Sequence, residues 1–173
     1  AAGLEEGVIT ETSKFYCSHI YRQFTDTTFK CLGSHGWIDV KNALNQSCNI
    51  YFYETGRLLG INRMNDYCTR FGLGQKTGVE INESSGVLAG IAYREAHGGT
   101  WYPGDTVQAA IGQSDNLFTP IQLCSYVSTI ANGGTRYRAH FVKSVKSSDY
   151  SETLLSNDGV VLNETGVSQN SIR

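Results

Sequence analysis

The chain has 173 residues, of which 40% are hydrophobic and 17% are charged, and its formal net charge is -2. The charged share is well below the roughly 25% of an average soluble domain, and the basic residues are scattered, so no nucleic acid partner is expected. No apolar run reaches the roughly 20 residues that a membrane helix needs, and no signal peptide is recognisable. These properties predict one domain's worth of globular chain that is long enough to bury a core.

The first fifty residues contain a series of metal-ligand types, most of them in a region rich in glycine and aromatic residues: Cys17, Cys31, His35 and Cys48. Three thiols and an imidazole suit a tetrahedral structural zinc ion, which would brace the loop beneath Ser47. The spacing is longer than in the usual paired-ligand motifs, so two other states stay open. One is a Cys17–Cys31 disulfide in an oxidising compartment, and the other is a set of buried free thiols.

Three helices are predicted in the middle of the chain. Asp39 can cap a helix that continues to about Gln46, because its carboxylate accepts an N–H of the first turn. A second helix is predicted over Asn49–Leu59 and ends at Gly60, where a left-handed residue is cheapest as glycine. A third helix is capped by Asn62. Its other marks are apolar residues at helical spacing and a terminal glycine: Met64, Tyr67, Cys68, Phe71 and Gly72.

The best-marked helix runs from Pro120 to Asn132. Thr119 caps it, Pro120 occupies the first position, where a missing N–H costs nothing, and Gly133 ends it. Its apolar face is predicted to be buried. This face consists of Leu123, Cys124, Val127, Ile130 and Ala131.

Beyond Gly134 the pattern changes to a period of two. Apolar and basic side chains alternate from Arg136 to Phe141, with the basic residues expected to face outward, which predicts a half-buried strand over Thr135–Val145 as the first strand of a sheet. Residues 146–171 are rich in Ser, Asn and Asp and are predicted to form a surface excursion.

The triplet Ser47-Cys48-Asn49 lies at the start of the apolar, aromatic-rich second helix. A Ser-x-Asn triplet alone carries little information, because both residues are common. Three further runs follow it: Trp101–Thr106, Ala109–Leu123 and Thr129–Arg136.

With these flanks and in this order, the chain resembles the class B penicillin-binding proteins of the elongation type. Their motif set is Ser-x-x-Lys, Ser-x-Asn and Lys-Thr-Gly. The resemblance covers essentially the whole chain. It implies an α+β fold, mostly helical in this fragment, that is shared with serine β-lactamases, and it implies that residues 1–173 are the central part of a single transpeptidase domain.

Two of the three family motifs are missing. No Ser-x-x-Lys occurs, and the only Lys-Thr-Gly is Lys76-Thr77-Gly78. Three glycines over residues 71–78 mark a loop, whereas the family places its third motif on a strand after the Thr119 helix. We therefore interpret this triplet as a chance match. The domain is expected to be incomplete at both ends, and the isolated fragment is expected to be inactive.

The resemblance assigns roles to two side chains. The Ser47 hydroxyl would bond the absent Lys and pass a proton to the departing amine, and the Asn49 amide would hold the substrate backbone. A hydroxyl and a carboxamide suit these roles because each donates and accepts hydrogen bonds. Spacing alone leaves an ordinary alternative open, in which Ser47 is a helix cap and Asn49 a turn residue.

The resemblance further implies that the parent protein cross-links peptidoglycan stem peptides through a serine acyl-enzyme and binds β-lactams, with no cofactor required. Its partners would be stem peptides, β-lactams and other cell-wall synthesis proteins. Its place would be the extracytoplasmic face of the bacterial membrane, anchored by an N-terminal segment absent from this chain. Two alternatives stay open: a non-catalytic β-lactam-binding or peptidoglycan-binding sensor module, and a β-lactamase-like hydrolase, which the runs around Trp101 and Thr119 disfavour.

Overall fold

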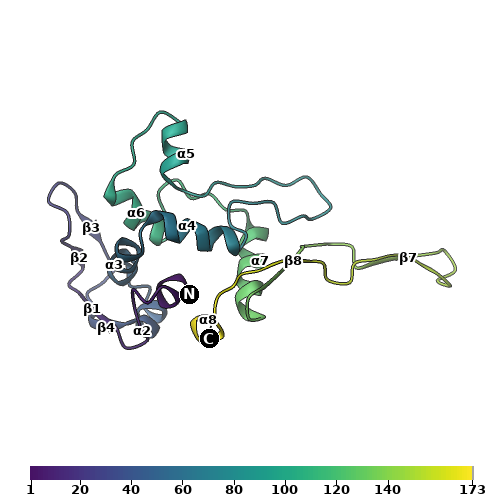
Figure 1. Cartoon of the computed structure of the whole chain (residues 1–173), viewed down its shortest axis with the longest axis horizontal. Helices are drawn as coiled ribbons and strands as arrows, with labels where there is room; N and C mark the ends of the chain where they lie inside the picture. The colour runs from purple at the N-terminus through teal and green to yellow at the C-terminus, as the bar shows by residue number, and fades with distance from the viewer. Residues whose placement is uncertain (173) are drawn as a thin grey trace. The chain divides into compact units, whose positions relative to one another are not determined.

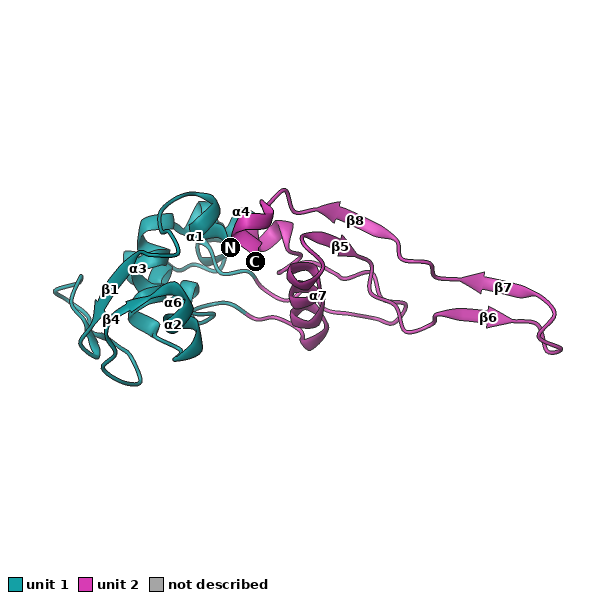
Figure 2. Ribbon diagram, turned by 90° about the horizontal axis from the view of Figure 1, so that it is seen from below, with its two compact units in different colours: residues 1–66, 88–116 teal, residues 67–87, 117–173 magenta. Residues whose placement is uncertain are grey.

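The structure is a computed structural model that describes residues 1–172, and the chain divides into two compact units (Figures 1 and 2). Unit 1 comprises Ala1–Asp66 and Leu88–Asn116, and unit 2 comprises Tyr67–Val87 and the described part of Leu117–Arg173. Helices hold more of the described residues than strands do, which agrees with the predicted α+β class. Among residues 1–172 no helix combines the length and apolar character needed to cross a bilayer.

Unit 1 is built mainly of helices and carries two small antiparallel sheets, β1 with β4 and β2 with β3. Helix α4 continues into unit 2. The elements, in chain order, are α1 (Ala2–Glu5), β1 (Lys14–Cys17), β2 (Ile20–Tyr21), β3 (Phe29–Lys30), β4 (Gly36–Asp39), α2 (Val40–Asn45), α3 (Asn49–Leu59), α4 (Ile61–Arg70), α5 (Ile91–Ala96) and α6 (Pro103–Ala110). The prediction that the first strand begins at Thr135 was therefore wrong, because strands of two to four residues are too short to show an alternating pattern.

Helix α3 is the centre of the unit 1 core. Tyr51 is fully buried, with its ring 4.9 Å from that of Phe15 between centroids. On the opposite side α3 approaches α6 so closely that a Cβ atom on Gly56 would lie 2.3 Å from the Cβ of Ala110. The helix that begins at Asn49 is therefore held both by aromatic packing and by a close helix–helix contact.

All three helices predicted in the middle of the chain are present, as α2, α3 and α4. Asp39 caps α2 by accepting from the Asn42 N–H at 2.9 Å, and α3 ends at Gly60, whose φ is 78°. The predicted cap at Asn62 was wrong. Helix α4 begins at Ile61, directly after Gly60, so Asn62 already lies inside its first turn.

Unit 2 combines one long helix with two strand pairs, β5 with β8 and β6 with β7, which follow one another along a narrow ribbon (Figure 2). Its elements are α7 (Pro120–Ala131), β5 (Thr135–Tyr137), β6 (Ser144–Lys146), β7 (Thr153–Ser156), β8 (Val161–Glu164) and α8 (Gln169–Ile172). The predicted cap of α7 is confirmed and is reciprocal. Thr119 Oγ1 accepts from the Gln122 N–H, and Gln122 Oε1 accepts from the Thr119 N–H.

The buried face predicted for α7 was wrong. Leu123 and Val127 are 45% and 57% exposed and Cys124 is also exposed, whereas Gln122 and Thr129 are 1% exposed. The physical reason is that α7 packs inside unit 2 through a different side. The Gln122 amide donates to two loop carbonyls at 2.6 and 2.7 Å, and these bonds compensate for the burial of this polar side chain.

The predicted strand over Thr135–Val145 was partly wrong. It consists of two short strands, β5 and β6, with an irregular stretch between them. The expected orientation is also inverted at its start, because Arg136 is 5% exposed and Tyr137 is 44% exposed. The Arg136 guanidinium donates to Gln75 Oε1 at 3.0 Å and to the Lys76 carbonyl at 3.2 Å, and these bonds hold the cation inside unit 2. Residues 146–171, predicted as a surface excursion, contain β7 and β8.

Candidate active site

The turn that carries Ser47 is formed by the meeting of two helices. Helix α2 ends at Gln46, Ser47 adopts the left-handed conformation with φ 50°, and Cys48 is extended as the N-cap of α3. A left-handed non-glycine residue is uncommon and costs on the order of 1 kcal/mol or more. Such conformations are found at sites where surrounding structure imposes them, and here two helices fix the chain on either side.

The three side chains of the turn point to different surroundings. Cys48 is fully buried, Ser47 is exposed, and Asn49 is partly exposed. The Ser47 hydroxyl makes no hydrogen bond to any described residue, and the Asn49 amide donates to the Lys30 carbonyl at 3.3 Å. Ser47 is therefore not the helix cap of the ordinary alternative, because the N-cap is Cys48 and no side chain caps there. The catalytic roles of Ser47 and Asn49 stay predictions.

The four predicted metal-ligand residues come together directly beneath this turn. One ligand atom each of Cys17, Cys31, His35 and Cys48 lies within 4.8 Å of all the others. His35 Nδ1 lies 3.4 Å from Cys17 Sγ and 3.6 Å from Cys31 Sγ. With bonds of about 2.3 Å to sulfur, the ligand atoms of a tetrahedral zinc ion are about 3.5–3.8 Å apart. The cluster therefore needs only small adjustments to fit such an ion.

The surroundings of the thiols also suit a cation. Burial alone would raise the pKa of Cys31, but backbone N–H groups, including those of Asn49 and Ile50 at the start of α3, lower it. Burial raises the pKa of Cys48 to about 12 in the absence of a cation. A cation bound to the sulfurs would reverse that effect, since a metal deprotonates its thiol ligands. All five cysteines are free thiols in the structure.

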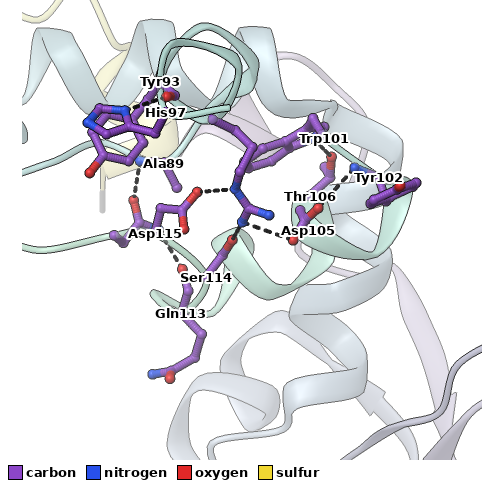
Figure 3. Close-up of polar contacts among 12 residues, drawn as sticks. Ala89, Tyr93, His97, Trp101, Tyr102, Asp105, Thr106, Gln113, Ser114 and Asp115 are labelled. Carbon is purple, nitrogen blue, oxygen red and sulfur yellow. Dashed lines mark hydrogen bonds and ion pairs between the residues drawn. The ribbon is translucent and has the colours of Figure 1, made fainter. Parts of the chain in front are cut away.

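Two other Ser-x-Asn triplets occur, and the structure separates the first of them from the candidate site. In Ser114–Asn116, Ser114 Oγ accepts from Arg94 at 3.2 Å. The Asn116 side chain accepts from the Ala89 N–H at 2.9 Å and donates to the Ala109 carbonyl at 3.2 Å. Figure 3 shows this network around Ser114, Asp115 and Ala89. These side chains are committed to holding unit 1 together, unlike the hydroxyl of Ser47.

The remaining triplet, Ser168–Asn170, lies at the start of the four-residue helix α8. The Lys76-Thr77-Gly78 motif lies in an irregular loop, as predicted from its glycines. Thr77 is buried, and both its N–H and its hydroxyl donate to Glu83 Oε2. Thr77 and Gly78 therefore have a structural role without catalysis, because the Gly78 N–H also donates to Glu83.

Comparisons with known proteins agree along the whole chain. The family model of the penicillin binding protein transpeptidase domain matches residues 1–173. The chain is 31% identical over 149 residues to peptidoglycan D,D-transpeptidase MrdA of Salmonella typhimurium, covering 82% of this chain and 23% of that protein. The chain thus spans about a quarter of the length of this curated relative.

Solved structures give the same result. Pseudomonas aeruginosa PBP2 matches 99% of this chain and 39% of its own, with a TM-score of 0.83 and 28% identity. Helicobacter pylori PBP2, in its complex with MreC, matches 88% of this chain and 30% of its own, with a TM-score of 0.73 and 25% identity.

Proposed function

Because the chain belongs to the penicillin-binding protein transpeptidase family, we propose that it is part of a peptidoglycan D,D-transpeptidase that cross-links stem peptides through a serine acyl-enzyme and binds β-lactams. The observation that carries this proposal is the exposed, unpaired Ser47 hydroxyl beside Asn49 on a turn fixed by two helices, in a chain that matches the family model from end to end. No Ser-x-x-Lys occurs in residues 1–173, so the nucleophile and its base are assigned to the parent protein outside this range.

In this mechanism the residues of the chain handle a proton and position the substrate. Acyl transfer needs a proton for the departing amine. The Ser47 hydroxyl would relay it, giving its own proton to the amine as it takes another from the Lys of the parent protein, because no other described group occupies this hydroxyl. The Asn49 amide would donate to the peptide backbone of the substrate in place of its bond to the Lys30 carbonyl. Both groups stay neutral throughout, so neither requires a shifted pKa.

The test is the second-order rate of acylation by a fluorescent penicillin in the parent protein. Asn49→Ala should slow acylation about a hundred- to a thousandfold, the effect of losing one hydrogen bond made in the transition state, about 2.7–4 kcal/mol. Ser47→Ala should also slow it. Melting temperatures should change little for Ser47→Ala, because the exposed hydroxyl has no partner among the described residues.

The matched controls are Ser168→Ala and Asn170→Ala, which alter a triplet of the same residue types in unit 2. Their acylation rates should equal that of wild type. Normal rates for Ser47→Ala and Asn49→Ala would contradict the catalytic assignment. Acylation without cross-linking by the parent protein would favour the sensor-module alternative. The isolated 173 residues should not be labelled by the penicillin, since the Ser-x-x-Lys nucleophile is absent from them.

We also propose that Cys17, Cys31, His35 and Cys48 hold a structural zinc ion, supported by the mutual distances of their ligand atoms. Bound zinc would tie β1, the loop before β4 and the start of α3 to one point and supply folding free energy directly. Because Cys48 lies between Ser47 and Asn49, this link would fix the turn from below.

The zinc proposal is tested by metal content and thermal unfolding of the purified chain. One zinc per chain is expected, and a chelator should lower the melting temperature. Cys48→Ser should lose the metal, whereas Cys68→Ser and Cys124→Ser, outside the cluster, should keep it. A melting temperature lowered by reductant alone would instead indicate the Cys17–Cys31 disulfide. Insensitivity to both reagents would leave free thiols.

For the parent protein we propose stem peptides, β-lactams and other cell-wall synthesis proteins as partners. The Helicobacter pylori relative is found in a complex with MreC, which supports a partner of that kind. We place the parent on the extracytoplasmic face of the bacterial membrane, where its proposed polymer substrate is assembled.

A further inference from the structure

Unit 1 carries a groove of about 340 Å³ beside the candidate active site. Its walls come from β1, β2, β4 and α3, and six of its residues give it its chemistry: Lys14, Tyr16, Arg22, Trp37, Ile50 and Glu54. This volume lies within the roughly 300–1,000 Å³ typical of sites for small ligands.

One wall of the groove carries the aromatic rings of Tyr16 and Trp37, whose planes are tilted by 58° so that each ring offers its own face. The two residues are directly opposed in the β1–β4 register, with ring centroids 5.5 Å apart. They are 57% and 70% exposed, whereas their strand neighbours Cys17 and Ile38 are 1% and 3% exposed. Strand alternation therefore turns both rings to solvent. Paired exposed aromatic rings of this kind mark binding surfaces, and flat ring faces suit the C–H faces of sugars.

The charges in the groove favour an anionic ligand. Its one lining carboxylate, Glu54, is already paired with Arg57 at 2.6 and 3.0 Å. Arg22 and Lys14 have no carboxylate within 4 Å among residues 1–172. Asp39 lies opposite Lys14 in the register, and its pKa is lowered by hydrogen bonds from Asn42 and also by the charge of Lys14, so Lys14 already faces a carboxylate. Arg22 is thus left to face a ligand carboxylate.

The groove is adjacent to the candidate active site through α3. Ile50, which lines the groove, directly follows Asn49, and Glu54 lies about one turn further along the same helix. A substrate held by the Asn49 amide could therefore extend along α3 into the groove. A protein partner would need about 800 Å² of surface on each side, which suits a broad face better than a narrow groove with interleaved polar and cationic side chains.

We propose that this groove binds the glycopeptide portion of the substrate, with sugar rings against Tyr16 and Trp37 and a stem-peptide carboxylate at Arg22. The inference rests on the proposed function for the identity of the polymer. The inference adds an anchoring site beside the turn that carries Ser47 and Asn49. This site selects a stem peptide that carries sugars over a stem peptide without them.

The test is calorimetric binding to the 173-residue chain with three probes: a muropeptide (a disaccharide carrying a stem peptide), a neutral N-acetylglucosamine oligosaccharide and the free stem peptide. The muropeptide should bind most tightly. Trp37→Ala should weaken binding of the muropeptide and of the neutral oligosaccharide about tenfold, the loss of one stacked ring. Arg22→Gln should weaken the muropeptide and leave the neutral oligosaccharide unchanged.

The matched controls are Tyr150→Ala, whose ring is 77% exposed in unit 2, and Lys146→Gln on the same ribbon. Both should bind like wild type, and melting curves should confirm that all variants fold. No muropeptide binding, equal weakening by the control variants, or a Trp37→Ala effect limited to self-association would overturn the inference. Binding does not require acylation, so failure of the parent to react with penicillin would contradict the proposed function without changing this result.

Discussion

The contact between α3 and α6 offers the sharpest test of the structure, through the change Gly56→Ala. The added Cβ would lie 2.3 Å from Ala110 Cβ, whereas carbon atoms pack at about 3.5–4.0 Å. The methyl group of Ala110 is attached directly to the backbone and cannot turn away. The helices must therefore separate by more than about 1 Å, and the helix that presents Asn49 must move.

The expected size follows from two opposing effects. Overpacking in a well-packed core costs about 1–3 kcal/mol of unfolding free energy. The upper end applies here because both contacting atoms are Cβ atoms, which cannot move without their helices. Alanine is a better helix former than glycine by about 0.8–1.0 kcal/mol. The net loss of unfolding free energy should be about 2 kcal/mol, equivalent to a fall in melting temperature of about 4–8 °C for a chain of this size.

Urea unfolding of two further variants makes the test specific. Ala110→Gly removes the atom that clashes, and the next atoms near the new Cβ, Thr106 O at 3.6 Å and Ala110 Cα at 3.7 Å, are ordinary contacts. The double variant should therefore return to within about 0.5 kcal/mol of wild type, although each single change destabilises. Gly104→Ala is the control, because its Cβ would meet only side-chain atoms, the far end of the Phe29 ring at 2.9 Å and Thr27 Cγ2 at 4.0 Å, and no helix backbone or Cβ. A Gly56→Ala chain as stable as wild type, or a double variant no better than Gly56→Ala, would refute the packing.

At the start of α7, Gln122→Ala should destabilise by about 2–3 kcal/mol, because it removes three hydrogen bonds of a buried amide, each contributing about 1 kcal/mol. Thr119→Ala should cost only about 1 kcal/mol, and chemical unfolding in which the two losses were equal would contradict the network. The pKa of Glu54 is lowered by hydrogen bonds from Arg57 and then Tyr21, so this carboxylate stabilises the fold above its ordinary value of 4.5 and ceases to do so as pH falls through the lower folded value. The melting temperature of wild type should therefore fall more steeply than that of Glu54→Gln between about pH 5 and about pH 2, and parallel curves would contradict this.

Helix ends could be predicted from the sequence where the signal is local. Asp39, Gly60 and Thr119 each act on backbone groups within four residues, so their effects can be read from neighbouring positions. The position of Arg136 could not be predicted in this way. Two of its hydrogen-bond partners lie about sixty residues earlier in the chain and a third, Asn163, lies 27 residues later. An alternating pattern predicts an outward cation when no such partners are known.

The candidate site shows the same division. The family motif located Ser47 and Asn49. The residue types of the metal cluster suggested that Cys17, Cys31, His35 and Cys48 meet, but their long spacing could not decide among zinc, a disulfide and free thiols. The apolar face of α7 was misread for a related reason. A hydrophobic stripe indicates which face could be buried, whereas the packing of Gln122 decides which face unit 2 covers.

The five thiols differ in burial, so the rate at which each is chemically modified reports how often its surroundings open. In unit 2, Cys124 is exposed and Cys68 is half-buried with its pKa raised by burial to about 11, whereas unit 1 holds three fully buried thiols. An alkylating reagent should modify Cys124 at once and the others only as their surroundings open. Counting the attached labels by mass against time would therefore give separate opening free energies for the two units from one unmodified sample.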